Sequence, residues 1–228
     1  MDCYGPQQWW PADEPFEVMV GAILTQSAAW VNVEKAINNL KAAGMLSPRA
    51  LRRLSLNELA ALIRPCGYFN AKAGKLKALV EWLSQAYSDD LAKLLATSLK
   101  QLRPQLLTVH GIGEETADSI ILYAASKPVF VIDAYTRRII DRIGLAPRCS
   151  RGNSYSAYQT FFMENLPHRT TLFNEYHALL VHHGKKVCRK QPLCPECCLK
   201  DICRYGQEAT SQPHPLYPPL LERRGEEN

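Results

Sequence analysis

Apolar residues recur along most of the chain at spacings of three and four, which is the period of an amphipathic α-helix. The first such stripe comprises Phe16, Met19, Val20, Ile23 and Leu24. Three more stripes follow: Leu76, Leu79, Val80 and Leu83; Ala117, Ile120, Ile121 and Ala124; and Leu172, Tyr176, Leu179 and Leu180. Strand patterns are almost absent, because the apolar run 129–132 is short and leads into another helical stretch. The sequence therefore predicts an all-α protein of about ten helices with short connections.

Composition narrows the class of protein. The 228 residues are 46% hydrophobic and 21% charged, which suits one globular domain or two closely packed lobes. No apolar run approaches the roughly 18 residues that a membrane span needs, and residues 1–14 lack the pattern of a secretion signal. The net charge of +5 is compatible with a polyanionic partner and does not establish one. Several prolines after residue 205 predict an extended or disordered tail over 207–228.

A turn of sequence Gly111-Ile112-Gly113 separates two helical stretches, of which the second begins at Glu114. Glycines permit a tight turn, and the free N–H groups of a helix N-terminus attract a phosphate oxygen. Such a contact positions a protein on DNA without reading its bases. An ordinary corner between two helices explains the same residues, so the turn alone leaves both interpretations open.

Asp133 follows the apolar run 129–132 and precedes a further helical stretch. A carboxylate at such a place can stabilise positive charge that develops on a substrate. It can also orient or deprotonate an attacking water. Aspartate is equally a good helix N-cap, which is the simpler explanation for an isolated residue at this place.

Four cysteines lie close together near the C-terminus, in the pattern C-x5-C-x2-C-x5-C: Cys188, Cys194, Cys197 and Cys203. Four thiolates at this density predict a site for one soft metal centre. The residues alone do not separate zinc from a [4Fe–4S] cluster. Cys198 is a rival to Cys197 as the third ligand.

Together, the turn, its spacing to Asp133 and the later cysteines resemble the helix-hairpin-helix DNA glycosylases, most closely the endonuclease III branch. The resemblance covers residues 9–205. It implies two helical lobes around a DNA-binding cleft. One lobe is a helical barrel over 14–128 that contains the hairpin. The other combines 1–13 with 129–206 and carries the cysteine loop 188–203.

The same resemblance assigns roles to individual residues. It implies that Asp133 is the catalytic aspartate. It implies contacts with DNA from four residues: Gly111, Ile112, Gly113 and Lys185. It also favours a [4Fe–4S] cluster over zinc at the four cysteines, although the first gap between them is one residue shorter than the common family spacing. We expect the cluster to be structural or to support DNA binding.

One position departs from the bifunctional members of that family. They carry a lysine in the first turn after the hairpin, and its amine attacks the sugar to form a Schiff base before the strand breaks. This chain has Glu115 there. A carboxylate cannot form an imine, so the resemblance implies a monofunctional glycosylase that uses water and leaves an abasic site.

Three of the four tryptophans fall within residues 9–30. This region is similar to that of the endonuclease III-like 3-methyladenine glycosylases, which implies a pocket for the flipped base made by Trp9, Trp10, Pro11, Trp30 and Gln26. Glycosylases hold an extruded base between flat side chains. Aromatic faces add about 1–2 kcal/mol of cation–π attraction when an alkylated purine is positively charged. Core packing explains the tryptophans as well.

These observations predict a monofunctional glycosylase of base-excision repair that removes alkylated purines of the 3-methyladenine type from double-stranded DNA. One alternative is a glycosylase of the same branch for mismatched thymine, uracil or oxidised pyrimidines. Another is a non-catalytic iron–sulphur protein that binds DNA. We expect a cytoplasmic, nucleoid-associated monomer with no membrane partner.

Overall fold

A computed structural model describes residues 3–7, 9–147 and 155–211 of the chain. Within these ranges the backbone forms helices, turns and irregular segments, and no strand. The all-α prediction is therefore confirmed. None of the helices in the described ranges has the length and apolar character that crossing a membrane requires.

The helices are short and follow one another closely. In the first part of the chain they are α1 Pro15–Leu24, α2 Trp30–Ala42, α3 Pro48–Arg53, α4 Leu56–Leu62, η1 Arg64–Cys66, α5 Phe69–Tyr87, α6 Leu91–Ala96 and α7 Leu99–Leu107. They continue with α8 Glu114–Ser119, the π-helical turn η2 Ile120–Ala124, α9 Ala134–Ile143, α10 Tyr155–Asn165, α11 Thr170–Lys186, η3 Cys194–Glu196 and α12 Arg204–Ser211.

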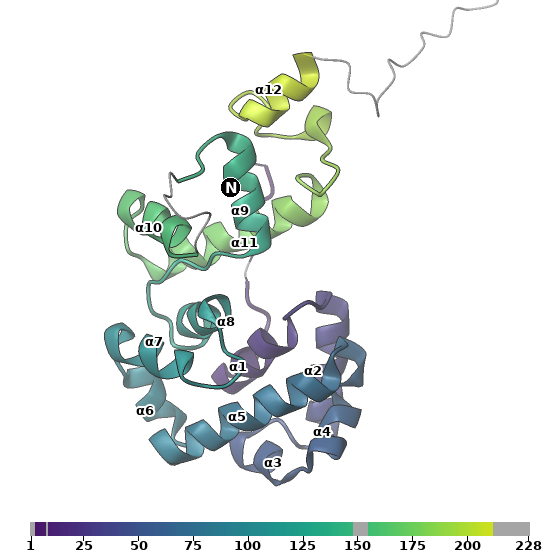
Figure 1. Cartoon of the computed structure of the whole chain (residues 1–228), viewed down its shortest axis with the longest axis vertical. Coiled ribbons are helices and arrows are strands. Elements are labelled where there is room, and N and C mark those ends of the chain that lie inside the picture. The colour runs from purple at the N-terminus through teal and green to yellow at the C-terminus, as the bar shows by residue number, and fades with distance from the viewer. Residues whose placement is uncertain (1–2, 8, 148–154, 212–228) are drawn as a thin grey trace, which may run out of the picture.

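The helices gather at two ends of an elongated molecule. Figure 1 shows α1 to α8 at one end, with α8 on the side that faces the second group, and α9 to α12 at the other end. The N-terminal residues lie with the second group, because the hydroxyl of Tyr4 is hydrogen-bonded to Nδ1 of His183 on α11 at 2.7 Å. The segment that carries Trp9 and Trp10 thus runs between the two groups on its way to α1.

Three of the four predicted apolar stripes form the core as expected. Every stripe residue of α1 and of α5 is buried. The stripe that begins at Ala117 continues from α8 into η2, and its members are buried too. These elements pack on one another, with α1 in contact with both α5 and η2.

The predicted stripe on α11 is wrong in detail. Only Leu180 of its four members is buried, and the buried side of the helix instead includes Phe173, His177 and Val181. The helix is in contact with α9 and η2, so the packing partners decide which side is covered. As a result His177 faces the interior of the protein.

Helices α9 and α11 approach closely because Gly184 has no side chain. A Cβ atom at Gly184 would lie 2.6 Å from Cδ1 of Tyr135 on α9. Arg138 of α9 then donates from Nη2 to the carbonyl of Gly184 and from Nε to that of Cys188, both at 2.9 Å. This contact fixes the start of α9, which is where Asp133 lies.

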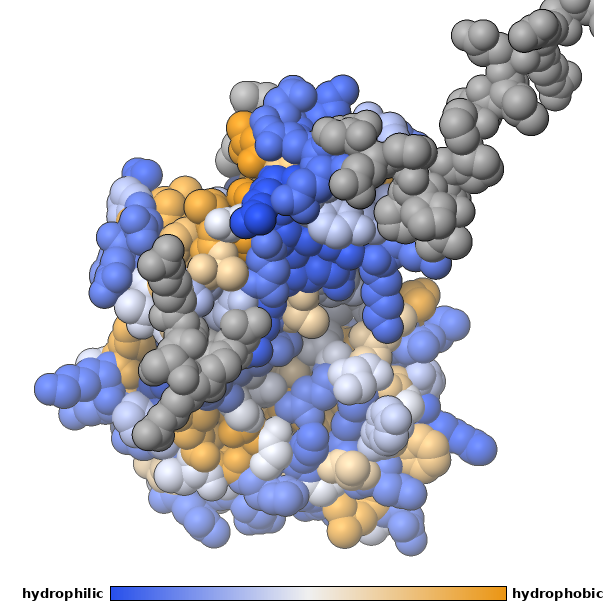
Figure 2. Space-filling model, turned by 45° about the horizontal axis from the view of Figure 1, so that its top comes forward, coloured by the Kyte–Doolittle hydropathy of each residue, from blue (hydrophilic) through white to orange (hydrophobic). Residues whose placement is uncertain are grey.

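The extended tail was predicted to begin at residue 207, which is too early. Residues 204–211 form α12, so the prediction is wrong for 207–211, while 212–228 lie outside the described residues. Helix α12 packs against α9 and η3. Figure 2, which brings this end of the molecule forward, shows a mainly hydrophilic surface with separate hydrophobic patches.

Candidate active site and cysteine cluster

Asp133 is the N-cap of α9, and its carboxylate has one oxygen committed to that role. Oδ1 accepts a hydrogen bond from the backbone N–H of Thr136 at 2.7 Å. Oδ2 lies 3.8 Å from Nε2 of His177. The side chain is 13% exposed, so it is accessible to solvent at one edge. The structural role and a chemical role are therefore compatible, since capping leaves the second oxygen available.

His177 links Asp133 to a tyrosine on the π-helical turn. Nδ1 of His177 is 2.5 Å from the hydroxyl of Tyr123. Burial lowers the pKa of His177, an effect that the charge of Asp133 opposes and that of Lys185 reinforces. Burial also raises the pKa of Tyr123 well above its ordinary value. Both groups are thus neutral near pH 7, and Asp133 faces an uncharged imidazole.

Three tryptophans and this tyrosine form one aromatic cluster. The ring of Trp9 lies 5.7 Å from that of Trp10 and 5.3 Å from that of Trp30. Trp10 also contacts Trp30 at 5.3 Å, edge to face, and Tyr123 at 5.2 Å. The indole N–H groups of Trp9 and Trp10 are buried without a hydrogen-bond partner in the described residues. The cluster therefore combines aromatic rings with two buried, unpaired indole donors, and it reaches Asp133 through Tyr123 and His177.

Lys185 lies over this cluster. Its Nζ is 5.5 Å from the centre of the Trp9 ring, in a cation–π contact. Partial desolvation lowers the pKa of Lys185, and the negative charge of Asp133 opposes that shift. Pro11, also predicted for the pocket, is exposed. The structure thus brings Lys185, predicted for DNA contact, next to the predicted base pocket.

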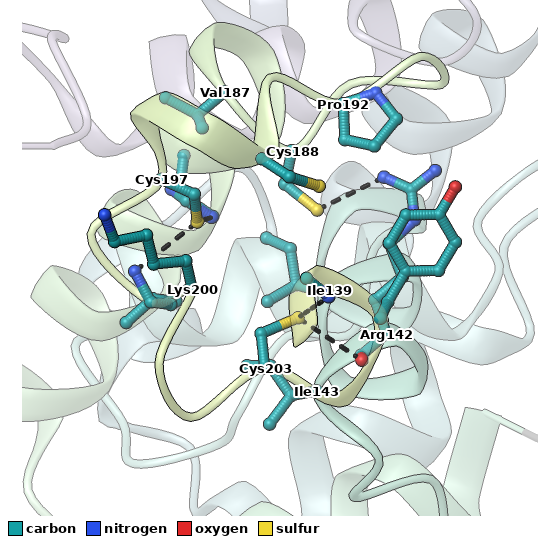
Figure 3. A pocket seen from close by; sticks show the side chains of 14 residues that line it. Ile139, Arg142, Ile143, Val187, Cys188, Pro192, Cys197, Lys200 and Cys203 are labelled. Carbon is teal, nitrogen blue, oxygen red and sulfur yellow. Dashed lines mark hydrogen bonds between the residues drawn. The ribbon is translucent and has the colours of Figure 1, made fainter. Parts of the chain in front are cut away.

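The four predicted metal ligands line a single cavity. Cys188, Cys194, Cys197 and Cys203 all border it, together with Arg142 and other residues of α9, the cysteine loop and α12. Figure 3 shows the sulphur atoms of Cys188, Cys197 and Cys203 around this space. All four are free thiols. In the described ranges no three cysteine, histidine or acidic side chains converge closely enough to bind one ion.

Hydrogen-bond donors surround the sulphur atoms of that cavity. Arg142 donates to Sγ of Cys188 at 3.3 Å, and the N–H of Leu199 donates to Sγ of Cys197 at 3.4 Å. The N–H of Gly206 donates to Sγ of Cys203 at 3.4 Å. Such donors stabilise thiolate ligands and tune an iron–sulphur centre. The chemistry of the donor set therefore fits a thiolate-bound cluster.

Cys198 has different surroundings from its neighbour Cys197. It does not line the cavity, and its thiol donates to the hydroxyl of Tyr4 at 3.8 Å. Cys197 faces the cavity and lies 3.7 Å from Nε2 of His183. The geometry therefore separates the two candidates for the third ligand, which sequence spacing left open.

The hairpin is held against α1 by a glutamine. Nε2 of Gln26 donates to the carbonyl of Gly111 at 3.0 Å and to Oγ1 of Thr116 at 2.9 Å. Lys75 donates to the other end of the same amide, Oε1 of Gln26, at 2.5 Å. The side chain of Gln26 thus contacts the hairpin and Lys75, whereas we predicted it in the base pocket with the tryptophans.

Ile112 does not offer a surface for DNA. Its side chain is 4% exposed and its N–H donates to the carbonyl of Val109 at 3.1 Å. Gly113, in contrast, is exposed at the start of α8. Any contact of the hairpin with DNA is therefore expected from the two glycines, and it stays a prediction.

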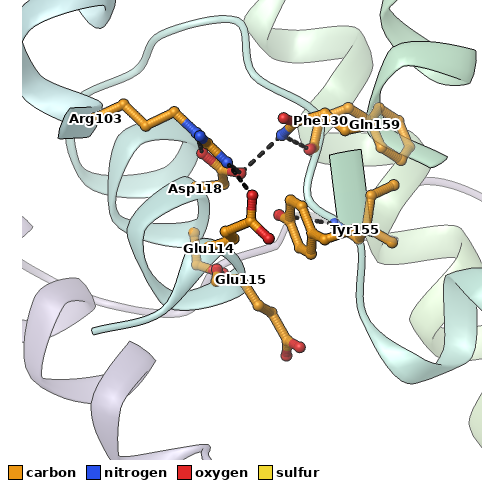
Figure 4. Close-up of polar contacts among 9 residues, drawn as sticks. Arg103, Glu114, Glu115, Asp118, Phe130, Tyr155 and Gln159 are labelled. Atoms are coloured by element: carbon orange, nitrogen blue, oxygen red, sulfur yellow. Dashed lines mark hydrogen bonds and ion pairs between the residues drawn. The ribbon is translucent and has the colours of Figure 1, made fainter. Parts of the chain in front are cut away.

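Two adjacent glutamates at the start of α8 have different environments. Glu114 is 3.4 Å from Arg103, in a network with Asp118 and Gln159, whereas Glu115 points away from it (Figure 4). Glu115 is exposed at its outer edge, and partial loss of hydration raises its pKa to about 7, with a further contribution from the charge of Asp133 and opposition from Arg137. The charge of the candidate catalytic carboxylate therefore contributes to the raised pKa of Glu115.

The network around Asp118 joins the hairpin to α10. Arg103 donates to both oxygens of the fully buried Asp118, at 2.7 and 3.0 Å. Gln159 of α10 donates to the same carboxylate at 2.7 Å and to the carbonyl of Phe130 at 2.8 Å. Because Phe130 precedes Asp133 by three residues, this network holds α8 in place relative to the candidate site.

Sequence reasoning missed Tyr123, His177 and the Arg103–Asp118 pair. A histidine within a predicted apolar helix was the available signal for His177, because a buried imidazole needs partners. Asp118 gave a similar signal, since a carboxylate on an apolar stripe requires a cation. Neither signal identifies the partner, which comes from a distant element in each case.

Comparisons with known proteins agree with this arrangement. Residues 20–167 match the family described as HhH-GPD superfamily base excision DNA repair protein. A putative DNA repair glycosylase of Methanocaldococcus jannaschii is 43% identical over 205 residues, covering 89% of this chain and 91% of that protein. Endonuclease III of Sulfolobus acidocaldarius is 29% identical, with 83% and 82% of the two chains covered.

A solved structure is similar as well. The crystal structure of H. pylori 3-methyladenine DNA glycosylase bound to 1,N6-ethenoadenine matches with a TM-score of 0.68 and 27% identity. The match covers 78% of this chain and 88% of that one. The family match, the shared all-α fold and the hairpin followed by a capping aspartate lead to one conclusion: the chain belongs to the HhH-GPD superfamily of base excision DNA repair proteins, as an endonuclease III-like DNA glycosylase.

Proposed function

We propose that this protein is a monofunctional DNA glycosylase that hydrolyses the N-glycosidic bond of alkylated purines in double-stranded DNA. Asp133 is the catalytic residue in this proposal. Its Oδ2 stabilises positive charge on the sugar and orients the attacking water, while Oδ1 remains bound to the N-terminus of α9. The product is a free base and an abasic site.

The observation that carries the proposal is a continuous set of contacts between the aromatic cluster and Asp133. Trp10 contacts Tyr123 at 5.2 Å, Tyr123 is hydrogen-bonded to His177, and His177 faces Asp133 at 3.8 Å. A base that stacks on the tryptophans would therefore have its sugar close to the carboxylate. Flat aromatic surfaces beside the reactive group are what a flipped base requires.

A purine with a positive charge suits the face of Trp9. This ring already has a cationic neighbour, because Lys185 lies over it at 5.5 Å. An alkylated purine that carries formal charge would take the place of that ammonium and gain about 1–2 kcal/mol of cation–π attraction. The similarity to a 3-methyladenine glycosylase that binds 1,N6-ethenoadenine supports the same class of base.

Glu115 supports the absence of lyase chemistry. It occupies the position at which bifunctional relatives carry a lysine, and it has no amine to form a Schiff base. Its carboxyl group interacts electrostatically with Asp133, which is the relationship expected of a residue near the reacting sugar.

Release of free base from a panel of duplexes tests the proposal. We expect release of 3-methyladenine from methylated DNA, and little release from duplexes with uracil, mismatched thymine or oxidised pyrimidine. Asp133→Asn should abolish release while DNA affinity stays nearly unchanged, because asparagine still caps α9. A preference for a pyrimidine would overturn the substrate class. Tight DNA binding without release of any base would indicate a non-catalytic protein.

We further propose that Cys188, Cys194, Cys197 and Cys203 hold a [4Fe–4S] cluster. Support comes from the cavity that all four line and from the N–H and guanidinium donors around their sulphur atoms. When bound, the cluster supplies structure to the loop, which carries Arg189, Lys190 and Lys200 as candidates for contact with the DNA backbone. Arg138 and Arg142 tie that loop to the helix that begins after Asp133.

Paired substitutions test the ligand set. Cys197→Ser should lower the content of iron and acid-labile sulphide and weaken visible absorbance, whereas Cys198→Ser should leave both near the wild-type level. The reverse result would make Cys198 the ligand. If the purified wild-type protein contains zinc but no iron and no sulphide, the four cysteines form a tetrahedral zinc site and the cluster proposal is wrong.

A further inference from the structure

His177 is a buried polar group that the reaction as described does not use. It is 6% exposed, on the inner side of α11. Its Nε2 atom is buried and has no hydrogen-bond partner in the described residues. The nearest charged oxygen is Oδ2 of Asp133 at 3.8 Å. An unpartnered nitrogen directed at the candidate catalytic carboxylate calls for a physical explanation, because buried polar atoms are normally satisfied.

The surroundings hold the imidazole ring in one orientation. Phe130 meets it edge to face at 6.5 Å between ring centres, and Tyr123 lies 5.9 Å away. The Tyr123 hydroxyl is hydrogen-bonded to Nδ1 of His177. Asp133, Tyr123 and Lys185 are the ionisable groups that act on this histidine. The ring is thus fixed by packing on one side and by a hydrogen bond on the other.

The two neutral tautomers of His177 differ in what they present to Asp133. With the proton on Nε2, an N–H faces the carboxylate, and Nδ1 accepts the hydrogen of the Tyr123 hydroxyl. With the proton on Nδ1, the lone pair of Nε2 faces the carboxylate. The Tyr123 hydroxyl oxygen then accepts the Nδ1–H, and the hydroxyl's own hydrogen has no acceptor on His177. The first arrangement gives the Tyr123 hydroxyl an acceptor and directs a partial positive charge at the carboxylate, whereas the second directs a lone pair at a negative charge.

We propose that His177 is a positioning residue for Asp133, and that Tyr123 acts through it by selecting the Nε2–H tautomer. The N–H of Thr136 fixes Oδ1 at 2.7 Å, and Nε2 of His177 faces Oδ2 at 3.8 Å, beyond hydrogen-bond distance, so its N–H acts on that oxygen electrostatically. The hydrogen bond on Oδ1 and the electrostatic attraction of the Nε2–H for Oδ2 at 3.8 Å together favour one rotation of the carboxylate about its Cβ–Cγ bond. One lone pair of Oδ2 stays available for the sugar or the water. His177 itself neither gains nor loses a proton in this role, which rests on the proposed function.

The first test reads the tautomer in the free protein and needs no activity. Nitrogen chemical shifts and couplings of the His177 ring should report a proton on Nε2 in the wild type. In Tyr123→Phe the Nδ1–H form should become populated, because the donor to Nδ1 is gone. A wild-type ring protonated on Nδ1, or a Tyr123→Phe ring unchanged from wild type, would overturn the proposal.

The second test separates positioning from folding by single-turnover release of base. His177→Leu keeps volume without a donor and should slow release about 100-fold, the effect of misplacing a reacting group. Affinity for an uncleavable abasic-site duplex should stay within about threefold of wild type. His177→Gln restores an N–H donor and should recover much of the rate. Tyr123→Phe should be slowed less than His177→Leu.

Tyr176→Phe is the matched control, since it removes a hydroxyl from the neighbouring residue on α11 and should leave release unchanged. Equal rates for His177→Leu and wild type would overturn the role of His177 while the proposed function stands. Equal losses in His177→Leu and His177→Gln, with parallel losses of affinity and melting temperature, would make the residue merely structural. A wild type that releases no base would instead overturn the proposed function and the positioning role with it.

Discussion

Gly111 lies against Lys75 so closely that a Cβ atom at Gly111 would be 2.2 Å from Cγ of Lys75. The backbone at Gly111 also has a φ of +82°, which side-chain-bearing residues rarely adopt. Lys75 is held in turn by its hydrogen bond to Gln26, whose amide binds the Gly111 carbonyl. The first glycine of the hairpin is therefore required by both its conformation and its neighbour.

Gly111→Ala should consequently destabilise the protein. We expect a loss of about 1–2 kcal/mol in the free energy of unfolding from the left-handed conformation alone, together with displacement of Lys75. Gly113→Ala is the matched control, because Gly113 has a φ of −92° and no atom within 4 Å of the added carbon. Its effect should be below about 1 kcal/mol. Equal denaturation midpoints for the two variants would contradict this explanation.

The ion pair of Arg103 and Asp118 should be among the most sensitive polar contacts in the chain. Asp118 is fully buried, and Arg103 and Gln159 both donate to it. Asp118→Asn removes the nearer charge partner of the guanidinium and leaves Glu114 at 3.4 Å, so we expect a loss of up to about 3–5 kcal/mol in chemical denaturation. Glu208→Gln removes the exposed pair with Arg204 and should cost less than about 1 kcal/mol. A small effect at Asp118 would show that water replaces the lost contacts.

Stability should depend on Glu115 in a defined pH range. Its pKa is about 7 in the folded protein, against 4.5 ordinarily. A carboxyl group with a raised pKa favours folding only while it is protonated, so the folded state loses stability as pH rises from about 4.5 to about 7. Glu115→Gln removes this loss. Because Glu115 is exposed, solvent screens the effect, so the variant's melting temperature should be slightly above that of wild type at about pH 8 and equal to it at about pH 4. A difference in melting temperature between the variant and wild type that does not change with pH would rule out titration of Glu115 as its cause.

Glu115→Lys should introduce the chemistry that the wild type lacks. The new amine occupies the position of the nucleophile in bifunctional relatives, and it can form a Schiff base with the sugar. We expect a borohydride-trapped protein–DNA adduct for this variant and none for wild type. Glu114→Lys provides the control, because Glu114 is directed toward Arg103, away from the direction of Glu115. An adduct with the wild-type protein would contradict the monofunctional proposal.

The helical class and several local features could be predicted from the order of residues along the chain. Periodic apolar residues predicted α1 and α5 correctly, because a helix that buries one side needs that spacing whatever its partners are. The turn at Gly111 and the capping role of Asp133 were also local, since each depends on a few neighbouring residues. Cysteine spacing predicted a shared site for the same reason.

The contacts between distant groups depend on how the helices dock, and the sequence pattern did not predict them. The buried side of α11 follows from its contacts with α9 and η2, and this packing directs His177 toward Asp133 and Tyr123. Packing likewise turned Cys197 to the cavity and Cys198 to Tyr4. Hydrophobic spacing identifies a helix and not its neighbours, because burial is non-directional. The partners of a buried polar atom are fixed only when the helices dock.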